Sequence, residues 1–465
     1  MQRGKIDMGE LASASLVLLG FVVLMFIYFT NGPSWDVVAQ YMYGKGVLTT
    51  QFLSHNFTIS GDTVYSNGMY IELFRYPLPG LALGVLSLIL NNSLLVFYVY
   101  VALLYVLYVY SLDRLARTLG INGLVLFALF INPYTVAFMF INNGSEALGA
   151  SLLLLGISAV LEGKEKKSGA MVSLMSLARY NSLIFLPLLL FLKKREKIFA
   201  SIAILLVPIG IWLVVNYYFF GNPFYSYYTA IIGEVVALQI TQYYPAALVA
   251  LLGLPAIFFA FYLIAKRYSK YKKLFKEEYK IAYALIALAV VGFILIEPRY
   301  DAFQQARLGY PITITLLFLA ALLIGSITNN NDKRSSRVLT ALGVLSAALL
   351  LWVAYYYYFN IGINPNTAAF SVLNQQSVFV GAKAELAALG LGGCRVISNQ
   401  WVLMRYYSVP AYSIYSINAS TLTYPIVDFN YSIPMPHYLL QNISKTVYSD
   451  NYFSIYLPKG YACVS

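Results

Sequence analysis

The sequence has 465 residues, of which 60% are hydrophobic and only 11% are charged, and its mean hydropathy is +0.69. This composition excludes a soluble globular chain, and repeated apolar runs of roughly 17–25 residues between short charged loops predict a polytopic helical membrane protein. The net charge of +12 does not indicate a nucleic-acid partner, because the basic residues are concentrated in a few short stretches.

These basic stretches determine the predicted topology. Six of them hold 21 of the 31 lysines and arginines, and they lie at residues 3–5, 114–117, 164–167, 193–197, 266–280 and 333–337. Cytoplasmic loops of membrane proteins carry such an excess of positive charge. We therefore place all six stretches in the cytoplasm, which puts the N-terminus inside as well.

With the basic stretches inside, the chain is predicted to cross the membrane about eleven times. Residues 31–92 become a long outer loop in which residues 77–90 form a helix along the outer face. A rival topology lets residues 77–90 span and makes residues 168–192 one helix, but it puts two basic stretches outside. The predicted spans are 11–30, 93–111, 123–140, 146–161, two short passes within 168–192 that turn at Arg179, then 198–217, 244–265, 281–296, 310–326 and 338–358.

The C-terminal segment has a different character. Alternating apolar positions and glycine turns predict a helix over 370–389, a strand over 395–398, a helix over 399–407 and further short strands. The fold class is thus an all-α polytopic membrane domain, residues 1–359, followed by a small extracytoplasmic α/β domain, residues 360–465. Cys394 and Cys463 both lie in this segment. They could form a disulfide or remain two free thiols, and their spacing alone does not decide between these alternatives.

A second group of charges is isolated and falls on the predicted outer side. Arginine suits bidentate phosphate binding, so arginines in outer turns indicate a lipid phosphate or pyrophosphate as ligand. Structural alternatives exist for several: Arg179 as an ion-pair partner, Arg75 paired with Glu72, and Glu146 as a charge favoured at a helix N-terminus. The isolated basic residues are Lys45, Arg75, Arg179, Arg299 and Arg307, and the acidic ones are Asp36, Asp62, Glu72, Glu146, Glu234, Glu297 and Asp301.

The order of these motifs resembles the GT-C class of integral-membrane glycosyltransferases. The resemblance runs along the whole chain and is strongest to the protein-O-mannosyl and lipid-A-aminoarabinose branches, with a prokaryotic or archaeal member expected. The motifs that carry it are Trp35-Asp36 after the first helix, Arg75-Tyr76-Pro77-Leu78-Pro79, Ser145-Glu146, Leu177-Ala178-Arg179-Tyr180-Asn181, Gly221-Asn222-Pro223, and Arg307 before Tyr310-Pro311.

The resemblance implies an inverting transfer of a sugar from a polyprenyl-phosphate carrier to a protein, lipid or glycan acceptor on the outer face. Asp36 would be the general base on the acceptor hydroxyl. Members of the class often carry two acidic residues here, whereas Val37 and Val38 follow Asp36 in this chain. The sequence therefore decides neither whether a divalent metal is required nor which residue is the second acid. The alternatives are a transporter or flippase of a lipid-linked or anionic substrate, and an inactive scaffold. The predicted substrate-binding residues are Glu72, Arg75, Glu146, Arg179, Tyr180, Arg307 and Tyr310.

Overall fold

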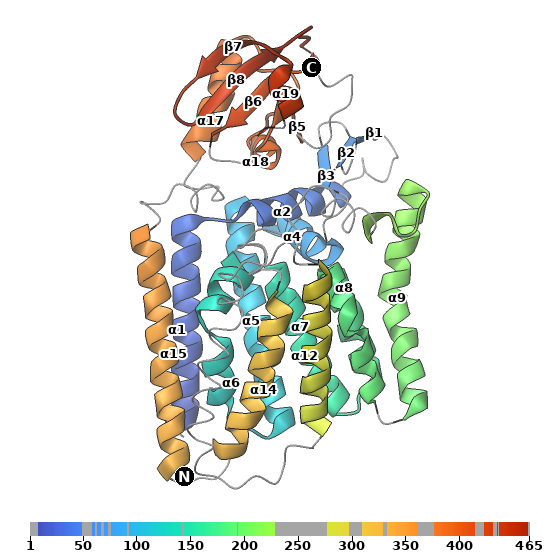
Figure 1. Cartoon of the computed structure of the whole chain (residues 1–465), viewed down its shortest axis with the longest axis vertical. Coiled ribbons are helices and arrows are strands. Elements are labelled where there is room, and N and C mark those ends of the chain that lie inside the picture. Colours follow the sequence, from blue (N-terminus) through green and yellow to red (C-terminus); the bar gives the residue numbers. More distant parts are fainter. Residues whose placement is uncertain are drawn as a thin grey trace. The chain divides into compact units, whose positions relative to one another are not determined.

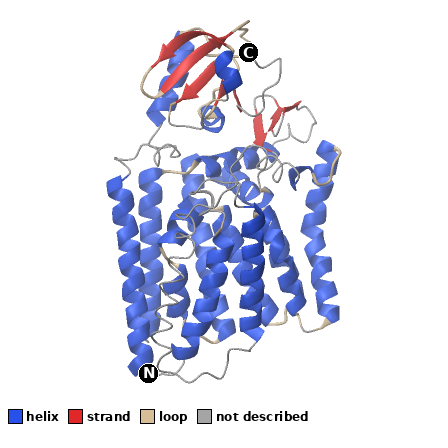
Figure 2. Cartoon of the chain, in the orientation of Figure 1, coloured by secondary structure: helices blue, strands red, loops and turns tan. Residues whose placement is uncertain are grey.

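The chain forms two compact units, each built from segments that are distant in the sequence (Figures 1 and 2). The first unit comprises residues 1–26 and 98–355, and the second comprises residues 27–97 and 356–465. The computed structural model describes residues 8–48, 58–60, 63–66, 69–72, 76–90, 93–141, 144–192, 194–227, 277–296, 309–328, 333–360, 376–413, 423–430, 435 and 437–463.

Four described helices are long and apolar enough to cross a membrane. Their lipid-facing character is visible in exposed apolar side chains such as Phe199, which is 71% exposed. The predicted span over 244–265 lies outside the described residues, so the number of eleven spans stays a prediction. The four helices are α1 (Met8–Asn31), α5 (Ser93–Leu119), α9 (Arg195–Phe220) and α15 (Lys333–Asn360).

The first unit also contains shorter helices. The helix α7 is buried on almost every side, which explains its uniformly apolar sequence. The other helices are α6 (Gly123–Phe130), the π-helical η1 (Thr135–Ile141), α7 (Ser145–Leu161), α8 (Glu165–Ala178), the 3₁₀-helical η2 (Tyr180–Phe191), α12 (Glu277–Ile296) and α14 (Tyr310–Thr328).

The prediction of one continuous helix over 123–140 is wrong, because the helix α6 ends at Phe130. Asn132 then caps the helical segment that leads into η1, because its Oδ1 accepts a hydrogen bond from the Thr135 backbone N–H at 3.0 Å. Pro133 follows the cap at a position where its missing N–H costs nothing. An Asn-Pro pair inside an apolar run was the signal for this break.

The predicted break at Arg179 is confirmed. Arg179 has an extended backbone conformation (φ −156°, ψ 124°) between α8 and η2. The two halves return to the same end of the unit, since Lys197 Nζ at the start of α9 lies 3.3 Å from Glu165 Oε2 at the start of α8. The rival prediction of a single helix over 168–192 is therefore wrong.

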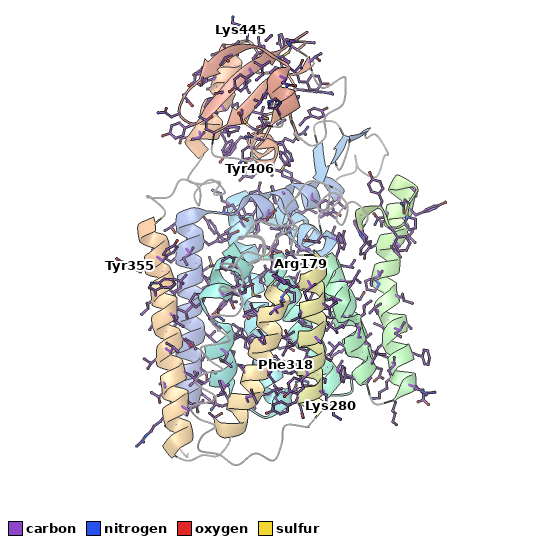
Figure 3. The ribbon with its side chains drawn as sticks, viewed as in Figure 1. Arg179, Lys280, Phe318, Tyr355, Tyr406 and Lys445 are labelled. Atoms are coloured by element: carbon purple, nitrogen blue, oxygen red, sulfur yellow. A yellow bond between two sulfur atoms is a disulfide. The ribbon has the colours of Figure 1, made fainter. Side chains whose placement is uncertain are left out.

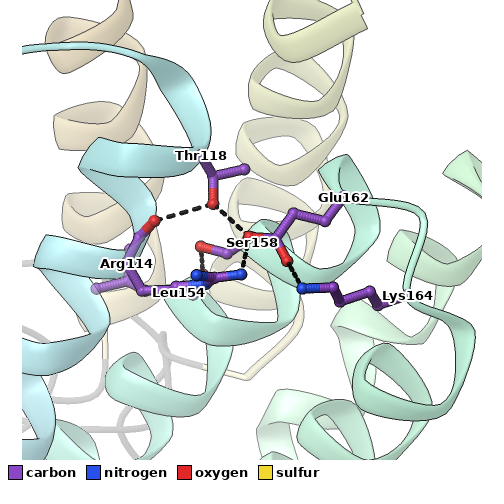
Figure 4. Close-up of polar contacts among 6 residues, drawn as sticks. All are labelled: Arg114, Thr118, Leu154, Ser158, Glu162 and Lys164. Carbon is purple, nitrogen blue, oxygen red and sulfur yellow. Dashed lines mark hydrogen bonds and ion pairs between the residues drawn. The ribbon is translucent and has the colours of Figure 1, made fainter.

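A cluster of charges ties the ends of α5, α7 and α8 together (Figure 4). Glu162 forms ion pairs with Arg114 and with Lys164, the latter at 2.6 Å, and accepts a hydrogen bond from Thr118 Oγ1 at 2.8 Å. Desolvation by the surrounding helices opposes ionisation of Glu162, but the hydrogen bonds from Lys164, Arg114 and Thr118 outweigh it and lower its pKa to about 2.

In the second unit, residues that were expected to form only a loop and one helix contain a further helix and a small sheet. The helix α2 (Trp35–Val47) starts at Ser34, whose Oγ accepts from the Val37 N–H at 3.4 Å. Strands β1 (Thr58–Ser60), β2 (Thr63–Ser66) and β3 (Met69–Glu72) form an antiparallel meander. The predicted helix over 77–90 is confirmed as α4 (Pro77–Leu90).

The helices α2 and α4 cross at backbone contact. A Cβ atom on Gly44 of α2 would lie 1.7 Å from the carbonyl oxygen of Gly80 on α4, so only glycine fits there. With 14 residues, α4 is about 21 Å long at 1.5 Å per residue. That is shorter than the roughly 30 Å hydrocarbon core of a bilayer, in keeping with the predicted non-spanning helix.

The C-terminal domain, defined here as α17 through β8, is α/β as predicted. Its sheet has the order β5-β4-β6-β8-β7, in which β4 is parallel to β5 and β6, and β8 is antiparallel to β6 and β7. Cys394 and Cys463 form a disulfide that closes the domain. The elements are α17 (Gln376–Ala388), β4 (Val396–Ser398), α18 (Trp401–Tyr406), β5 (Ala411–Ser413), β6 (Ile426–Phe429), α19 (His437–Gln441), β7 (Ile443–Ser449) and β8 (Phe453–Pro458).

Candidate functional site

Asp36, the predicted base, lies in the first turn of α2 in the second unit. It is partly exposed, while the next residues, Val37 and Val38, are buried. A carboxylate in the first turn of a helix is stabilised by the positive end of the helix dipole. The structure thus corrects the expectation of a loop residue: Asp36 is held by a capped helix, which gives its carboxylate a defined position.

The first unit contains a buried ion pair between two predicted site residues, Glu146 and Arg179. Arg179 is labelled in Figure 3. Arg179 Nη1 lies 2.5 Å from Glu146 Oε1, and the two side chains are 1% and 0% exposed. Ser145 connects them further: its Oγ accepts from Arg179 Nη1 at 3.2 Å and donates to Glu146 Oε2 at 3.1 Å. The alternative of Arg179 as an ion-pair partner is therefore realised, and its partner is Glu146.

Local backbone geometry brings this pair together. Arg179 occupies the extended break between α8 and η2, and Glu146 lies in the first turn of α7. Gly144 directs the chain into α7 with φ +71°, a conformation that other residues rarely adopt. A Cβ there would also lie 2.8 Å from Leu104 and 3.2 Å from the Tyr100 ring. The N-terminus of α7 is thereby packed directly against α5.

Two tyrosines lie around the ion pair, Tyr310 next to Arg179 and Tyr100 next to the start of α7. Tyr310, the first residue of α14, is 1% exposed, and its ring centre lies 5.8 Å from the Arg179 guanidinium carbon. Its hydroxyl is 3.0 Å from Ser182 Oγ on η2. Tyr100 is 3% exposed beside Gly144, and its hydroxyl has no hydrogen-bond partner within the described part of the chain. The cluster therefore combines a guanidinium, a helix N-terminus and a buried hydroxyl with unused hydrogen-bonding capacity.

Such a cluster is costly to bury, which makes it a candidate for function. Removing two charges from water costs several kcal/mol per ion, and the attraction between them repays this only with good geometry. Ionisable side chains within the helices of a membrane protein commonly mark substrate paths. The Glu146–Arg179 pair, with Ser145, Tyr100 and Tyr310, is therefore the candidate site of the first unit.

The remaining predicted residues are placed differently. Tyr180 is 5% exposed, and its ring centre lies 4.4 Å from that of Tyr227. Glu72 is the last residue of β3, while Arg75 and Arg307 lie outside the described residues. Tyr100 was not predicted, and no sequence signal distinguishes it from the other tyrosines of α5. The helix α2 was also missed, although Ser34 followed by Asp36 is a helix-start pattern.

A metal site is not formed by the residues that the structure describes. Among them, no group of three or more His, Cys, Asp or Glu side chains comes together. Glu146, a predicted partner acid, has its carboxylate engaged by Arg179 and Ser145. In this structure the Glu146 carboxylate is therefore committed to the ion pair with Arg179.

The fold is similar to those of ArnT and of the arabinofuranosyltransferase AftD, in agreement with the fold that the resemblance to the GT-C class predicted. The structure of ArnT from Cupriavidus metallidurans bound to undecaprenyl phosphate matches with a TM-score of 0.56 and 14% identity, covering 96% of this chain and 97% of ArnT. The structure of the arabinofuranosyltransferase AftD from Mycobacteria matches with a TM-score of 0.54 and 13% identity, covering 96% of this chain and 40% of AftD.

The sequence profile of the EpsG family matches residues 80–372, well over half of the chain. The chain therefore belongs to the EpsG family. No curated protein matches it in sequence.

Proposed function

We propose that this protein transfers a sugar from a polyprenyl-phosphate carrier to a hydroxyl group of a protein, lipid or glycan at the outer face of the membrane. The observation that carries the proposal is the likeness of fold to ArnT, a protein solved with undecaprenyl phosphate, over 96% of this chain. The buried cluster around Arg179 supports the same function, because arginine is the residue type best suited to phosphate binding.

The proposed reaction is a single displacement at the anomeric carbon of the donor sugar. The acceptor oxygen forms a bond to that carbon as the bond between the carbon and the phosphate oxygen breaks. The polyprenyl phosphate leaves with the electron pair, the acceptor proton passes to the Asp36 carboxylate, and the configuration at the anomeric carbon is inverted. The products are the glycosylated acceptor and the free polyprenyl phosphate.

Arg179 is the proposed phosphate-binding residue of the first unit. Glu146 and Ser145 both contact its Nη1 atom and so fix the plane of the guanidinium. The start of α7 and the Tyr100 hydroxyl add neutral hydrogen-bond donors, and helix N-termini bind phosphate through such groups. Preorganised donors of this kind stabilise the charge that develops on a leaving group. Arg75 and Arg307 are proposed as further phosphate ligands, with Glu72, Tyr180 and Tyr310 beside the sugar.

We also propose that the protein has one defined orientation in the membrane. Three of the basic stretches meet at one end of the first unit, where Arg114 and Lys164 contact Glu162 and Lys197 contacts Glu165. This grouping supports a cytoplasmic location for that end, with the N-terminus inside and the C-terminal domain outside.

The proposal predicts release of a lipid phosphate. Purified protein in detergent is incubated with a panel of undecaprenyl-phosphate-linked hexoses and pentoses and with an acceptor extract of membranes from the producing cells. At least one donor should yield undecaprenyl phosphate and labelled acceptor, and turnover without a membrane barrier separates transfer from transport. As a matched binding test, undecaprenyl phosphate should bind at least tenfold more tightly than undecaprenol, which lacks the phosphate. The absence of both release and this preference would overturn the proposal.

A further inference from the structure

The helix that carries Asp36 is buried by its neighbours in the second unit. Val37, Val38, Ala39 and Gln40 are at most 1% exposed, and Tyr41 is 6% exposed. The position of the Asp36 carboxylate is consequently set by whatever packs against α2, because a helix held on several sides cannot rotate or shift independently.

One of these neighbours belongs to the C-terminal domain. The helix α18 packs against α2 within the second unit (Figure 1). The contact is aromatic: the Tyr41 ring centre lies 5.1 Å from that of Phe97 and 6.5 Å from that of Tyr406, and the last two are 6.3 Å apart. These separations are within the range of favourable aromatic pairs. The ring of Tyr406 (labelled in Figure 3) therefore connects α18 to the helix of Asp36.

The ring of Tyr406 is continuous with the interior of the C-terminal domain. Its centre lies 5.2 Å from that of Tyr407, which stacks on Phe379 of α17 at 5.7 Å. Phe379 in turn packs on Phe429 of β6 at 4.8 Å. A chain of ring contacts thus extends from Tyr41 on α2 into the sheet.

The helix α18 is also fixed to β5 by a buried arginine. Arg405 is 8% exposed, its Nε donates to the Ala411 carbonyl oxygen at 2.5 Å, and its guanidinium carbon lies 5.7 Å from the Tyr412 ring centre. Because α18 has six residues and would not be stable alone, these contacts hold it in place.

We propose that the C-terminal domain positions the Asp36 carboxylate through the contact of Tyr406 with Tyr41. Tyr406 is then a positioning residue that acts through α2, and the domain is an integral part of the transferase. This inference rests on the proposed role of Asp36. A displacement of about 1 Å of a reacting group can lower a rate by about 100-fold. The loss of one ring that supports α2 should therefore lower the rate measurably.

The test is Tyr406→Ala, assayed with the undecaprenyl-phosphate sugar that turns over fastest. We expect kcat to fall about tenfold while KM for the donor stays within twofold, since the variant alters the position of the base and leaves the phosphate ligands intact. Tyr406→Phe, which keeps the ring, should retain at least half of kcat. The control is Tyr452→Ala, which removes a 53% exposed tyrosine from the same domain and should leave both constants unchanged.

A double-variant cycle separates this mechanism from general weakening of the fold. If Tyr41 and Tyr406 act through one contact, their effects on kcat should not add. The Tyr41→Ala, Tyr406→Ala double variant should then have a kcat no more than about twofold below that of the less active single variant. Where Tyr406→Ala lowers the yield of folded protein, Tyr406→Leu is assayed with the same expected direction.

The measurements distinguish a wrong function from a wrong role for Tyr406. No turnover or lipid-phosphate binding by the wild-type protein contradicts the function itself. Wild-type turnover with an unchanged kcat in Tyr406→Ala contradicts only the positioning role. A raised donor KM with unchanged kcat also overturns it, since Tyr406 would then contribute to substrate binding instead.

Discussion

At the residue scale, the most informative group is the guanidinium of Arg179, which is 1% exposed and bonded to a carboxylate that is fully buried. Its burial, and the possibility of an ion-pair role, follow from the sequence because Arg179 interrupts two apolar half-helices. Its partner does not follow from the sequence, because Glu146 is 33 positions away and pairing depends on how α7 packs against the hairpin of α8 and η2. Tyr100 was missed for the same reason.

The buried pair predicts a large loss of stability when one partner is neutralised. Glu146→Gln leaves the Arg179 charge without its counter-ion in a low-dielectric interior, and we expect a loss of about 3–5 kcal/mol in the free energy of unfolding. The measurement is unfolding in detergent. Adding Arg179→Met to Glu146→Gln should recover part of the loss, because it removes the uncompensated charge.

The matched control is an exposed ion pair of the same unit. Arg117 Nη2 lies 2.9 Å from Asp113 Oδ2, with side chains 73% and 39% exposed. Asp113→Asn should cost no more than about 0.5 kcal/mol, the usual value for an exposed helical pair. Equal losses of stability for Asp113→Asn and Glu146→Gln would contradict this prediction, because the Glu146–Arg179 pair would then contribute no more than an exposed ion pair.

At the element scale, charge located a turn that apolar content alone left open. The basic stretches on both sides of residues 168–192 required the chain to turn back, and the structure has a hairpin there. Apolar content alone was a poorer guide: it joined α6 to η1 across Pro133 and did not reveal α2. Buried helices lack the periodic polar face that marks a helix boundary, so only caps and prolines indicate where they end.

The charge cluster at the ends of α5, α7 and α8 predicts a pH dependence of stability. The pKa of Glu162 is lowered from its ordinary value of 4.5 to about 2 in the folded protein. The stabilisation is therefore fully present above pH 4.5 and is lost as the pH falls toward 2. Glu162→Gln should be less stable than the wild type at pH 6, and this difference should shrink steadily below pH 4.5.

Unfolding midpoints of wild type and variant between pH 6 and 3 provide the measurement. Glu196→Gln, which changes an exposed glutamate in the first turn of α9, is the control and should follow the wild type throughout. A difference between wild type and Glu162→Gln that is constant over this pH range would contradict the ion-pair account.

At the scale of the whole molecule, the fold class and the α/β character of the C-terminal domain were predictable, because hydropathy and charge are distributed along the entire chain. The division into units was not. The segment between α1 and α5 groups with the C-terminal domain, although hundreds of residues separate them. That association arises from packing such as Tyr41 on Tyr406, which no local pattern encodes. The prediction that residues 360–465 form a domain of their own stays untested as a boundary.

In the proposed reaction, Asp36 accepts the proton during transfer of a sugar from a lipid phosphate. The most direct test compares Asp36→Asn with wild type for donor binding and for transfer in the same preparation, with Asp113→Asn as the control for loss of one carboxylate. Because the amide cannot accept a proton at neutral pH, we predict a loss of transfer of at least 100-fold with donor affinity within threefold. A folded Asp36→Asn protein that transfers sugar at the wild-type rate would contradict the role of Asp36 as the general base.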